Sequence, residues 1–496
     1  MIFKLQKKNC FYIILSAITL TSFIFAVSLS NVKSLWYDDI YQIYFSWNRS
    51  FLETMDIVLE VDLNPPLWAV LSHLWLKIAP FGTGWLKLPS ILFVSAAIFV
   101  VGLIGKELFG KKVGIVSALL FSLSPIMTLD CAYSFRAYGL YLFASALIIY
   151  AYIKKIRVPS LKNRIFFGIA VFLIAFTHYF GALLCVFLGI SDLILVFMKK
   201  QKPSFFIEYV CVAFIELFWF IPQLTTINSA LSSFWPSRPT LRSFFNAVKY
   251  LMFDSSFLTL VFFASAIYFA ISLIKKIKKT GVKHLCKITV FTKLIFLLLP
   301  LFYILLIFIY SNVKPESSVW VDRYFFSLYP MMIIFLGATL VDIYRRLADK
   351  SANIRKSITV VSVLLIITVL IPNYAVQVVR KVNTEYEPFE EVAEIIVSRP
   401  EILSGEDILV ISTINCGKGW EYYLTHNNSR DISNIKTMDL LNYSHAEITS
   451  YDTVFLYAVH FDGSFSLDKI REEISQTHVE TIIDIEKNIF KYQKKK

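Results

Sequence analysis

Eleven long apolar runs divide most of this chain, and they constrain its fold more than any single residue does. Each run is long enough, or nearly so, to cross the roughly 30 Å hydrocarbon core of a bilayer as a helix. Hydrophobic residues make up 56% of the sequence, a share that excludes an ordinary water-soluble protein. We therefore expect a mainly α fold, a polytopic bundle of about 11 membrane-spanning helices. The runs lie at residues 10–29, 86–105, 113–129, 137–153, 163–178, 181–198, 204–222, 255–274, 289–310, 323–344 and 357–373.

Lysine and arginine fall mainly between alternate runs. With a cytoplasmic N-terminus, the segments assigned to the cytoplasm hold 26 of the 36 basic residues before Asn373, and the outward segments hold 10. This asymmetry is the one that sets orientation through short loops. An odd number of spans places the C-terminus outside. The high use of Ile, Phe and Lys with few Gly indicates a bacterial source, so we expect a multi-pass protein of the plasma membrane.

Two apolar stretches need a separate interpretation. The first run follows three lysines, but no small-residue cleavage pattern comes after it, so we interpret it as an uncleaved span. Residues 65–80 are apolar but short, and they contain His73 and Lys77. A full crossing there would turn every later basic cluster outward, so we expect a helix along the outer interface or a re-entrant segment. The six cysteines show no paired spacing and are interpreted as packing residues.

The composition changes after Asn373. Residues 374–496 hold 13 basic and 20 acidic side chains. A helical pattern at residues 389–397 precedes strand-like runs at 407–412, 453–458 and 481–485. The sequence therefore predicts a transmembrane domain at residues 1–373 and a small extracytoplasmic α/β domain at 374–496, without a phosphate-binding loop or dinucleotide fingerprint. Capture of an acceptor, a cover for a site, and assembly are all open as its role.

Outside the predicted spans, the notable polar residues lie at outer helix ends. They are Asp38 and Asp39 in the first outer loop (residues 31–85), Asp130, Tyr133, Arg136 and Tyr138 before the fourth span, His178 at the end of the fifth, and Arg323 at the start of the tenth. Taken singly, each has an ordinary explanation. Acids can begin a solvated loop, arginines anchor at the interface, and histidines pack. Glu216 lies within a span, and we leave it unassigned.

Taken together, these residues indicate chemistry on a lipid phosphate. Guanidinium groups match phosphate oxygens and stay charged when partly desolvated, which suits Arg136 and Arg323. A carboxylate beside them can accept the proton of an attacking hydroxyl or amine. The set fits transfer of a group from a lipid phosphate. Two alternatives are a transporter or flippase of a lipid-linked sugar, which would place polar groups near the bilayer midplane, and a non-catalytic scaffold for the C-terminal domain.

Six short motifs follow one another in a recognisable order. They are Trp36-Tyr37-Asp38-Asp39, Asn64-Pro65-Pro66-Leu67-Trp68, Phe109-Gly110-Lys111-Lys112-Val113-Gly114, Ser134-Phe135-Arg136-Ala137-Tyr138, Thr177-His178-Tyr179-Phe180 and Asp322-Arg323-Tyr324-Phe325. The pattern resembles that of the polytopic C-type glycosyltransferases related to protein O-mannosyltransferases and the lipid A aminoarabinose transferase. It covers about residues 10–345. Asp39 stands where this family usually has Glu, and Asn64 stands where His is frequent.

The resemblance implies an enzyme, an inverting glycosyltransferase that moves a hexosyl or pentosyl group from a polyprenyl-phosphate donor on the outer face of the membrane. It implies that Asp38 is the catalytic base, with Asp39 beside it in a role left open. Arg136, Arg323, Tyr138 and His178 are expected to bind the donor phosphate or sugar. The acceptor would be a lipid, a glycan or a protein. Membrane lipids are the other expected partners, and no metal, cofactor or nucleic acid is indicated.

Overall fold

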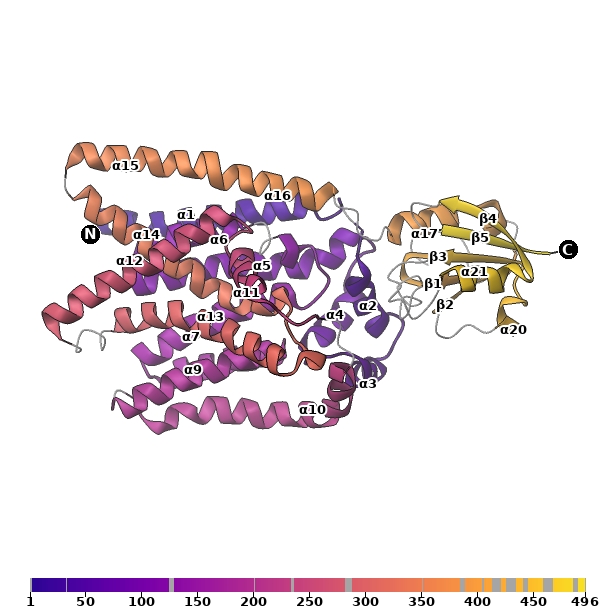
Figure 1. Ribbon diagram of the computed structural model, residues 1–496, viewed down its shortest axis with the longest axis horizontal. Coiled ribbons are helices and arrows are strands. Elements are labelled where there is room, and N and C mark those ends of the chain that lie inside the picture. Colours follow the sequence, from indigo (N-terminus) through magenta and orange to yellow (C-terminus); the bar gives the residue numbers. More distant parts are fainter. Residues whose placement is uncertain are drawn as a thin grey trace.

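The computed structural model describes residues 2–32, 34–124, 129–199, 201–232, 236–281, 288–349, 351–383, 389–403, 406–412, 421–424, 434–439, 445–457, 467–484 and 489–495. Within them the chain forms a large helical bundle with a small α/β domain at one end (Figure 1). The N-terminus lies at the opposite end of the bundle. This is the mainly α, polytopic architecture predicted from the apolar runs.

Long helices, nearly parallel or antiparallel to one another, make up the bundle (Figure 1). They are α1 (Ile2–Ser28), α5 (Thr83–Phe109), α6 (Lys111–Ser122), α7 (Tyr138–Arg157), α8 (Leu161–Ala175), α9 (Tyr179–Phe197), α10 (Ile207–Ser232), α12 (Ser256–Thr280), α13 (Ile288–Val313), α14 (Tyr329–Ala348), α15 (Ala352–Leu365) and α16 (Ile371–Asn383). A π-helical turn, η6 (Ile366–Leu370), joins α15 to α16. The shorter α11 (Leu241–Leu251) and the 3-10 turns η2 (Pro203–Phe206), η4 (Pro315–Ser317) and η5 (Asp322–Leu328) connect the bundle helices.

Nine helical segments of the described chain are long and apolar enough to cross a membrane, and each corresponds to a predicted span. The predicted spans at 113–129 and 163–178 correspond to shorter helices, α6 with 12 residues and α8 with 15, which are not among these nine. The apolar run of the first ends at Leu129, beyond α6, and the described residues around that point are buried in protein. Leu129, Cys131 and Ala132 are at most 1% exposed. Hydropathy does not distinguish such a loop from a lipid-facing helix.

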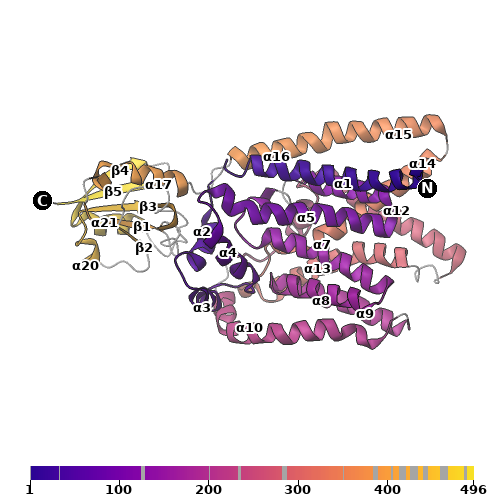
Figure 2. The same ribbon diagram turned by 180° about the vertical axis from the view of Figure 1, so that it is seen from behind.

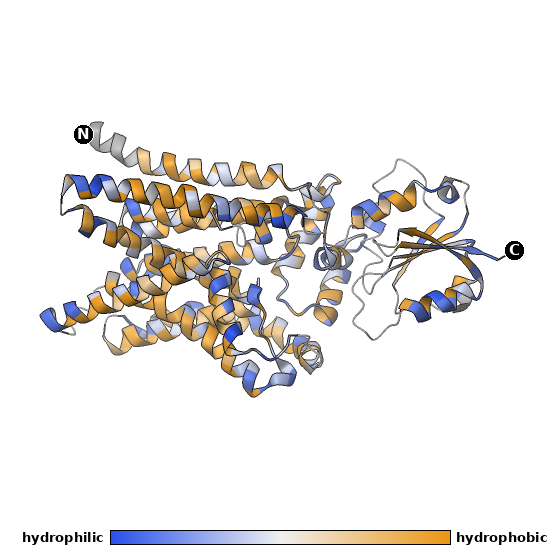
Figure 3. Cartoon of the chain, turned by 45° about the horizontal axis from the view of Figure 1, so that its top comes forward, coloured by the Kyte–Doolittle hydropathy of each residue, from blue (hydrophilic) through white to orange (hydrophobic). Residues whose placement is uncertain are grey.

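The centre of the bundle is α14, whose apolar window is 89% buried, against 11% for the segment containing α10. Exposed large apolar side chains are frequent on the outer helices, as a lipid environment requires, and Figure 3 shows the long helices coloured mostly as hydrophobic. Glycines allow α5 and α6 to approach closely. A Cβ added at Gly114 would lie 2.5 Å from the carbonyl oxygen of Gly102.

Three short helices cover the end of the bundle that faces the α/β domain. They are α2 (Tyr37–Ser46), α3 (Phe51–Val61) and α4 (Leu67–Ile78), and both views place them between the two parts (Figures 1 and 2). A capping box formed by Ser50 and Glu53 begins α3. The short helix α4 corresponds to the apolar residues 65–80, which the charge pattern excluded as a span.

The C-terminal domain is built on a five-stranded sheet in the order β2-β1-β3-β5-β4. The parallel strands are β1 (Ile408–Ser412), β2 (Ile435–Asp439) and β3 (Thr453–Tyr457), and β5 (Ile489–Lys494) runs antiparallel to β3 and β4 (His478–Asp484). The helices are α17 (Phe389–Val397), α18 (Pro400–Leu403), α20 (His445–Ile448) and α21 (Leu467–Ser475). The predicted helix and strands match α17, β1, β3 and β4, except that Ala458 and Ile485 lie outside the described residues.

The predicted domain boundary at residue 373 falls within α16, so the division of the chain into 1–373 and 374–496 stays a prediction. Contacts join the α/β domain to the end of the bundle. Trp47 and Phe81 pack their rings on Tyr422 at 4.9 and 5.2 Å. Thr83 Oγ1 donates a 2.6 Å hydrogen bond to Glu390 Oε2. Cys10, Cys131, Cys185 and Cys211 are free thiols, and the other two cysteines lie outside the described residues.

Replacing Gly114 by alanine should destabilise the protein by about 1–3 kcal/mol, because the new methyl group would force α5 and α6 apart. Thermal unfolding of the purified protein, followed by tryptophan fluorescence, measures this as a lowered Tm. Gly189 on α9 has no atom within 4 Å of an added Cβ, so Gly189→Ala is the matched control. Equal Tm values for the two variants would contradict the close approach.

Candidate active site

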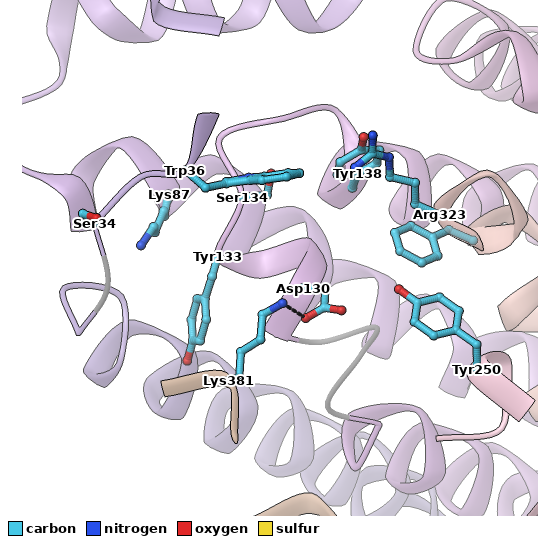
Figure 4. Close-up of a pocket in the computed structure, with 11 residues that line it drawn as sticks. Ser34, Trp36, Lys87, Asp130, Tyr133, Ser134, Tyr138, Tyr250, Arg323 and Lys381 are labelled. Carbon is cyan, nitrogen blue, oxygen red and sulfur yellow. Dashed lines mark ion pairs between the residues drawn. The ribbon is translucent and has the colours of Figure 1, made fainter. Parts of the chain in front are cut away.

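A cavity of about 310 Å3 lies where helix ends from several parts of the sequence meet (Figure 4). Its walls come from the segment before α2, the start of α5, the α6–α7 loop, the start of α7, the end of α11, η5 and the end of α16. The lining residues are Ser34, Trp36, Lys87, Asp130, Tyr133, Ser134, Tyr138, Tyr250, Arg323, Phe326 and Lys381. Two of the predicted site residues, Tyr138 and Arg323, therefore lie in its wall.

Asp38 and Arg323 form an ion pair beside this cavity. Asp38 lies in the first turn of α2 and Arg323 in η5, and 3.3 Å separates Asp38 Oδ2 from Arg323 Nη1. The two side chains are 23% and 27% exposed. Both groups are thus accessible to a ligand, and residues nearly 300 positions apart are brought together as predicted.

Two aromatic rings flank the Arg323 guanidinium. Its Cζ lies 5.8 Å from the centre of the Trp36 ring and 5.7 Å from that of Tyr138. Figure 4 shows the Trp36 and Tyr138 side chains on the same side of the cavity as Arg323. Ring faces attract a cation without neutralising it, so they hold the guanidinium while leaving its charge available to an anion.

Asp39 lies in a different environment from its neighbour. Its side chain is fully buried, and its Oδ1 accepts hydrogen bonds from Ser134 Oγ at 2.9 Å and from the backbone N–H of Phe135 at 2.6 Å. Burial raises the pKa of Asp39 to about 7, although the charge of Lys87 and the bond from Ser134 act in the opposite direction. Asp39 Oδ2 accepts no hydrogen bond from the described residues. The two adjacent acids are therefore distinct, because Asp38 is accessible and Asp39 ties α2 to the loop before α7.

The remaining charges of the cavity lie opposite Arg323. Lys381 from α16 forms an ion pair of 2.5 Å with Asp130, which is drawn in Figure 4. Lys87 Nζ donates to the backbone carbonyl of Ser30 at 3.1 Å and lies 5.9 Å from the centre of the Tyr133 ring. The lining therefore carries three cations and one carboxylate. Such an excess of positive charge suits an anionic ligand.

Arg136 does not line this cavity. Its Nη1 donates to Gln42 Oε1 at 3.5 Å. Burial raises the pKa of Asp62, and the charge of Arg136 acts in the opposite direction, which places the two groups in one electrostatic cluster. The charges of Asp38 and Asp39 also act on Arg136, so it lies near the Asp38–Arg323 pair without lining the cavity, and its predicted role at the donor phosphate stays a prediction.

His178 also lies outside the cavity wall. It caps α9, where its Nδ1 accepts from the backbone N–H of Phe180 at 3.2 Å. Its ring stacks on Tyr141 at 4.8 Å and meets the edge of Tyr324 at 5.1 Å. These contacts explain a buried histidine at this position, and its predicted role toward the donor stays a prediction.

A second hollow of about 420 Å3 adjoins the first through the shared residues Tyr250 and Arg323. Its other lining residues are Ser243, Asn246, Trp320, Val321 and Asp322. A ring beside amide, hydroxyl and carboxylate groups suits a polar molecule rich in hydrogen-bonding groups. Among the described residues, no three His, Cys, Asp or Glu side chains are placed to hold a metal ion.

Sequence reasoning missed Lys87 and Lys381 as site residues. Lys87 lies inside the predicted span at 86–105. The one indication of a role is that a lysine inside a membrane span is energetically unfavourable. Lys381 follows the last predicted span by several residues and lies outside the six motifs. Asp130 was noted among the outer polar residues without a role. Lys87, Lys381 and Asp130 reach the cavity through tertiary packing, which no local sequence motif indicates.

The pH dependence of stability should report the buried state of Asp39. In the folded protein its pKa is about 7 against an ordinary 3.8, so the folded state binds more protons between these values. Stability should therefore rise as pH is lowered from about 8 to about 5.5. Replacing Asp39 by asparagine should reduce this gain, measured as Tm against pH. Asp56→Asn, at an exposed position on α3, is the control, and identical pH profiles for all three proteins would contradict the assignment.

Known proteins were compared with the chain by sequence and by structure. No protein-family model and no curated protein matches the sequence. A structure of ArnT, the lipid A aminoarabinose transferase, from Cupriavidus metallidurans bound to undecaprenyl phosphate matches over 97% of both chains, at 12% identity and a TM-score of 0.59. Its apo structure matches over 98% of both chains, at 11% identity and 0.57. The chain therefore has the polytopic membrane fold of ArnT, as the resemblance of its six motifs implied.

Proposed function

We propose that this protein is a membrane glycosyltransferase that moves a sugar from a polyprenyl-phosphate donor to an acceptor. The observation that carries the proposal is the accessible Asp38–Arg323 pair beside a cationic cavity. A base and an anion-binding group must lie within one substrate's length of each other for such a transfer. This pair meets that requirement at the end of a bundle whose outer surface is apolar.

The cavity would hold the donor phosphate. Arg323 offers a planar fork of donors that matches phosphate oxygens, and Trp36 and Tyr138 keep it in place. Lys87 adds a second positive charge from the opposite wall. We retain Arg136 and His178 as proposed donor-binding residues that lie outside the cavity wall. The undecaprenyl phosphate bound by ArnT supports a lipid phosphate of this class as ligand.

The proposed reaction is a single displacement with inversion at the anomeric carbon. The acceptor oxygen or nitrogen attacks that carbon, and Asp38 takes up the proton that the acceptor loses. The bond from the anomeric carbon to the phosphate oxygen breaks, and the electron pair leaves with the polyprenyl phosphate. Arg323 stabilises the growing charge, with greater effect in a water-poor cavity than in bulk water. Asp39 would act as a positioning residue, because its hydrogen bonds hold Ser134 and Phe135 in the segment just before Tyr138, where α7 begins.

The acceptor would approach through the second hollow. That hollow reaches the first at Arg323, the ion-pair partner of the proposed base. Its Ser243, Asn246 and Trp320 provide contacts for a hydroxylated or amine-bearing molecule. A lipid, a glycan and a protein all satisfy this chemistry, and either a hexosyl or a pentosyl group fits the proposal.

We place the site on the outer face of the plasma membrane. The basic clusters that mark the cytoplasmic side lie at the other end of the bundle, in the last turns of α7 and α12. The N-terminus would then be cytoplasmic and the α/β domain extracytoplasmic. Transfer on this face uses a lipid-linked donor, because nucleotide sugars are not supplied there.

Replacing Asp38 by asparagine should reduce sugar transfer about 100- to 10,000-fold, while donor binding is kept or strengthened because the carboxylate paired with Arg323 is gone. The measurement is transfer of radiolabelled sugar from short-chain polyprenyl-phosphate donors by purified protein in lipid, with envelope extract as acceptor. Asp56→Asn controls for loss of a nearby acid. Equal transfer by wild type and Asp38→Asn would remove Asp38 from the mechanism. Binding without transfer in every acceptor extract would favour the transporter instead.

Replacing Arg323 by methionine should weaken binding of a short-chain polyprenyl phosphate about 10- to 100-fold, because a charge-assisted hydrogen bond is lost. Arg323→Lys should bind with intermediate affinity, since lysine keeps the charge but lacks the fork. Isothermal titration calorimetry on both variants measures the effect. Wild-type affinity in Arg323→Met would show that the phosphate lies elsewhere.

A further inference from the structure

Lys381 differs from the other cations of the cavity in where it comes from. It lies near the C-terminal end of α16, the last helix before the α/β domain, whose first helix α17 begins at Phe389. The join η6 makes α15 and α16 one continuous helical segment. None of the six motifs includes this segment. The cavity therefore contains one charged side chain that is carried by the connection to the C-terminal domain.

Lys381 is paired with Asp130. The 2.5 Å contact joins α16 to the loop between α6 and α7, and both groups line the cavity. The side chains are 27% and 26% exposed. Because both side chains face the cavity, an anion that enters it can compete with Asp130 for Lys381.

The cavity is arranged for such an exchange. Each of its cations contacts an oxygen of the protein, with Arg323 on Asp38, Lys87 on the Ser30 carbonyl and Lys381 on Asp130. Asp130 is the one carboxylate in the cavity lining of the described chain. A phosphate bound there would meet repulsion from Asp130 and attraction from Lys381. The same two residues thus oppose each other in their effect on a phosphate.

We propose that Lys381 is a ligand of the lipid phosphate, and that phosphate binding displaces Asp130 from Lys381. The inference rests on the proposed function and adds a residue and a route of coupling to it. Phosphate binding in the cavity then changes a contact of α16 and, through α16, acts on the C-terminal domain. The exchange gains strength during transfer, because the leaving phosphate monoester carries about −1.5 to −2 charges, more than the diester donor.

The test compares the affinities of two variants whose effects have opposite signs. Lys381→Met should weaken binding of a short-chain polyprenyl phosphate about 10- to 100-fold. Asp130→Asn should strengthen it several-fold, because the competing carboxylate is gone. The double variant should bind more weakly than Asp130→Asn but more tightly than Lys381→Met, because repulsion from Asp130 is relieved while the contact from Lys381 is lost. Lys162→Met, at an exposed position on α8, controls for loss of a lysine, and calorimetry measures all five proteins.

A purely structural pair gives a different result. If the contact only holds α16 in place, both single variants lose affinity and Tm together, and the proposal is overturned. Titrations with inorganic phosphate and with the matching polyprenyl alcohol test the two parts of the ligand separately. For both phosphate ligands, Lys381→Met should lower the affinity and Asp130→Asn should raise it. Neither variant should change the affinity for the alcohol. Wild-type protein that binds no polyprenyl phosphate would reject the proposed function itself. Unchanged affinity in Lys381→Met, with loss in Arg323→Met, would reject this inference alone.

Discussion

The two hydrogen bonds accepted by Asp39 determine how the rest of the site is arranged. They fasten the first turn of α2 to Ser134 and Phe135, and α7 begins a few residues later at Tyr138. With α2 fixed in this way, Asp38 is directed toward Arg323 at the cavity rim. A fully buried carboxyl is costly unless its bonds compensate, and its raised pKa shows that compensation is incomplete. The site therefore depends on hydrogen bonds to a carboxyl group whose charged form is destabilised by burial.

Charge is distributed unevenly along the bundle, and this links its stability to its proposed chemistry. The helix surfaces are apolar where lipid would contact them, and the polar groups with proposed roles gather at the end covered by α2–α4. There the cations contact rings and oxygens of the protein, and in the proposed exchange an anion replaces one of those contacts. A site at helix ends can admit a lipid headgroup from the interface while the chain of the lipid stays in the membrane. This arrangement favours transfer over transport through the midplane.

The sequence predicted those features that depend on local pattern. Hydropathy and charge identified nine of the spans and the α/β domain, and the motif order identified the fold and the meeting of Asp38 with Arg323. It failed where burial in protein resembles burial in lipid, as in the loop after α6. It did not distinguish Asp38 from Asp39, because exposure of adjacent residues is decided by distant packing partners. Lys87 and Lys381 were missed because nothing in their neighbours along the chain reports which cavity they enter.

The most direct measurement is an electron cryo-microscopy structure of the protein in lipid with a polyprenyl phosphate bound. We expect phosphate density within hydrogen-bonding distance of Arg323, with the prenyl chain leaving between helices toward the membrane. Density at the bilayer midplane, or at the basic end of the bundle near the end of α12, would contradict this placement of the donor phosphate. In that case the cavity beside Asp38 would not be the donor site.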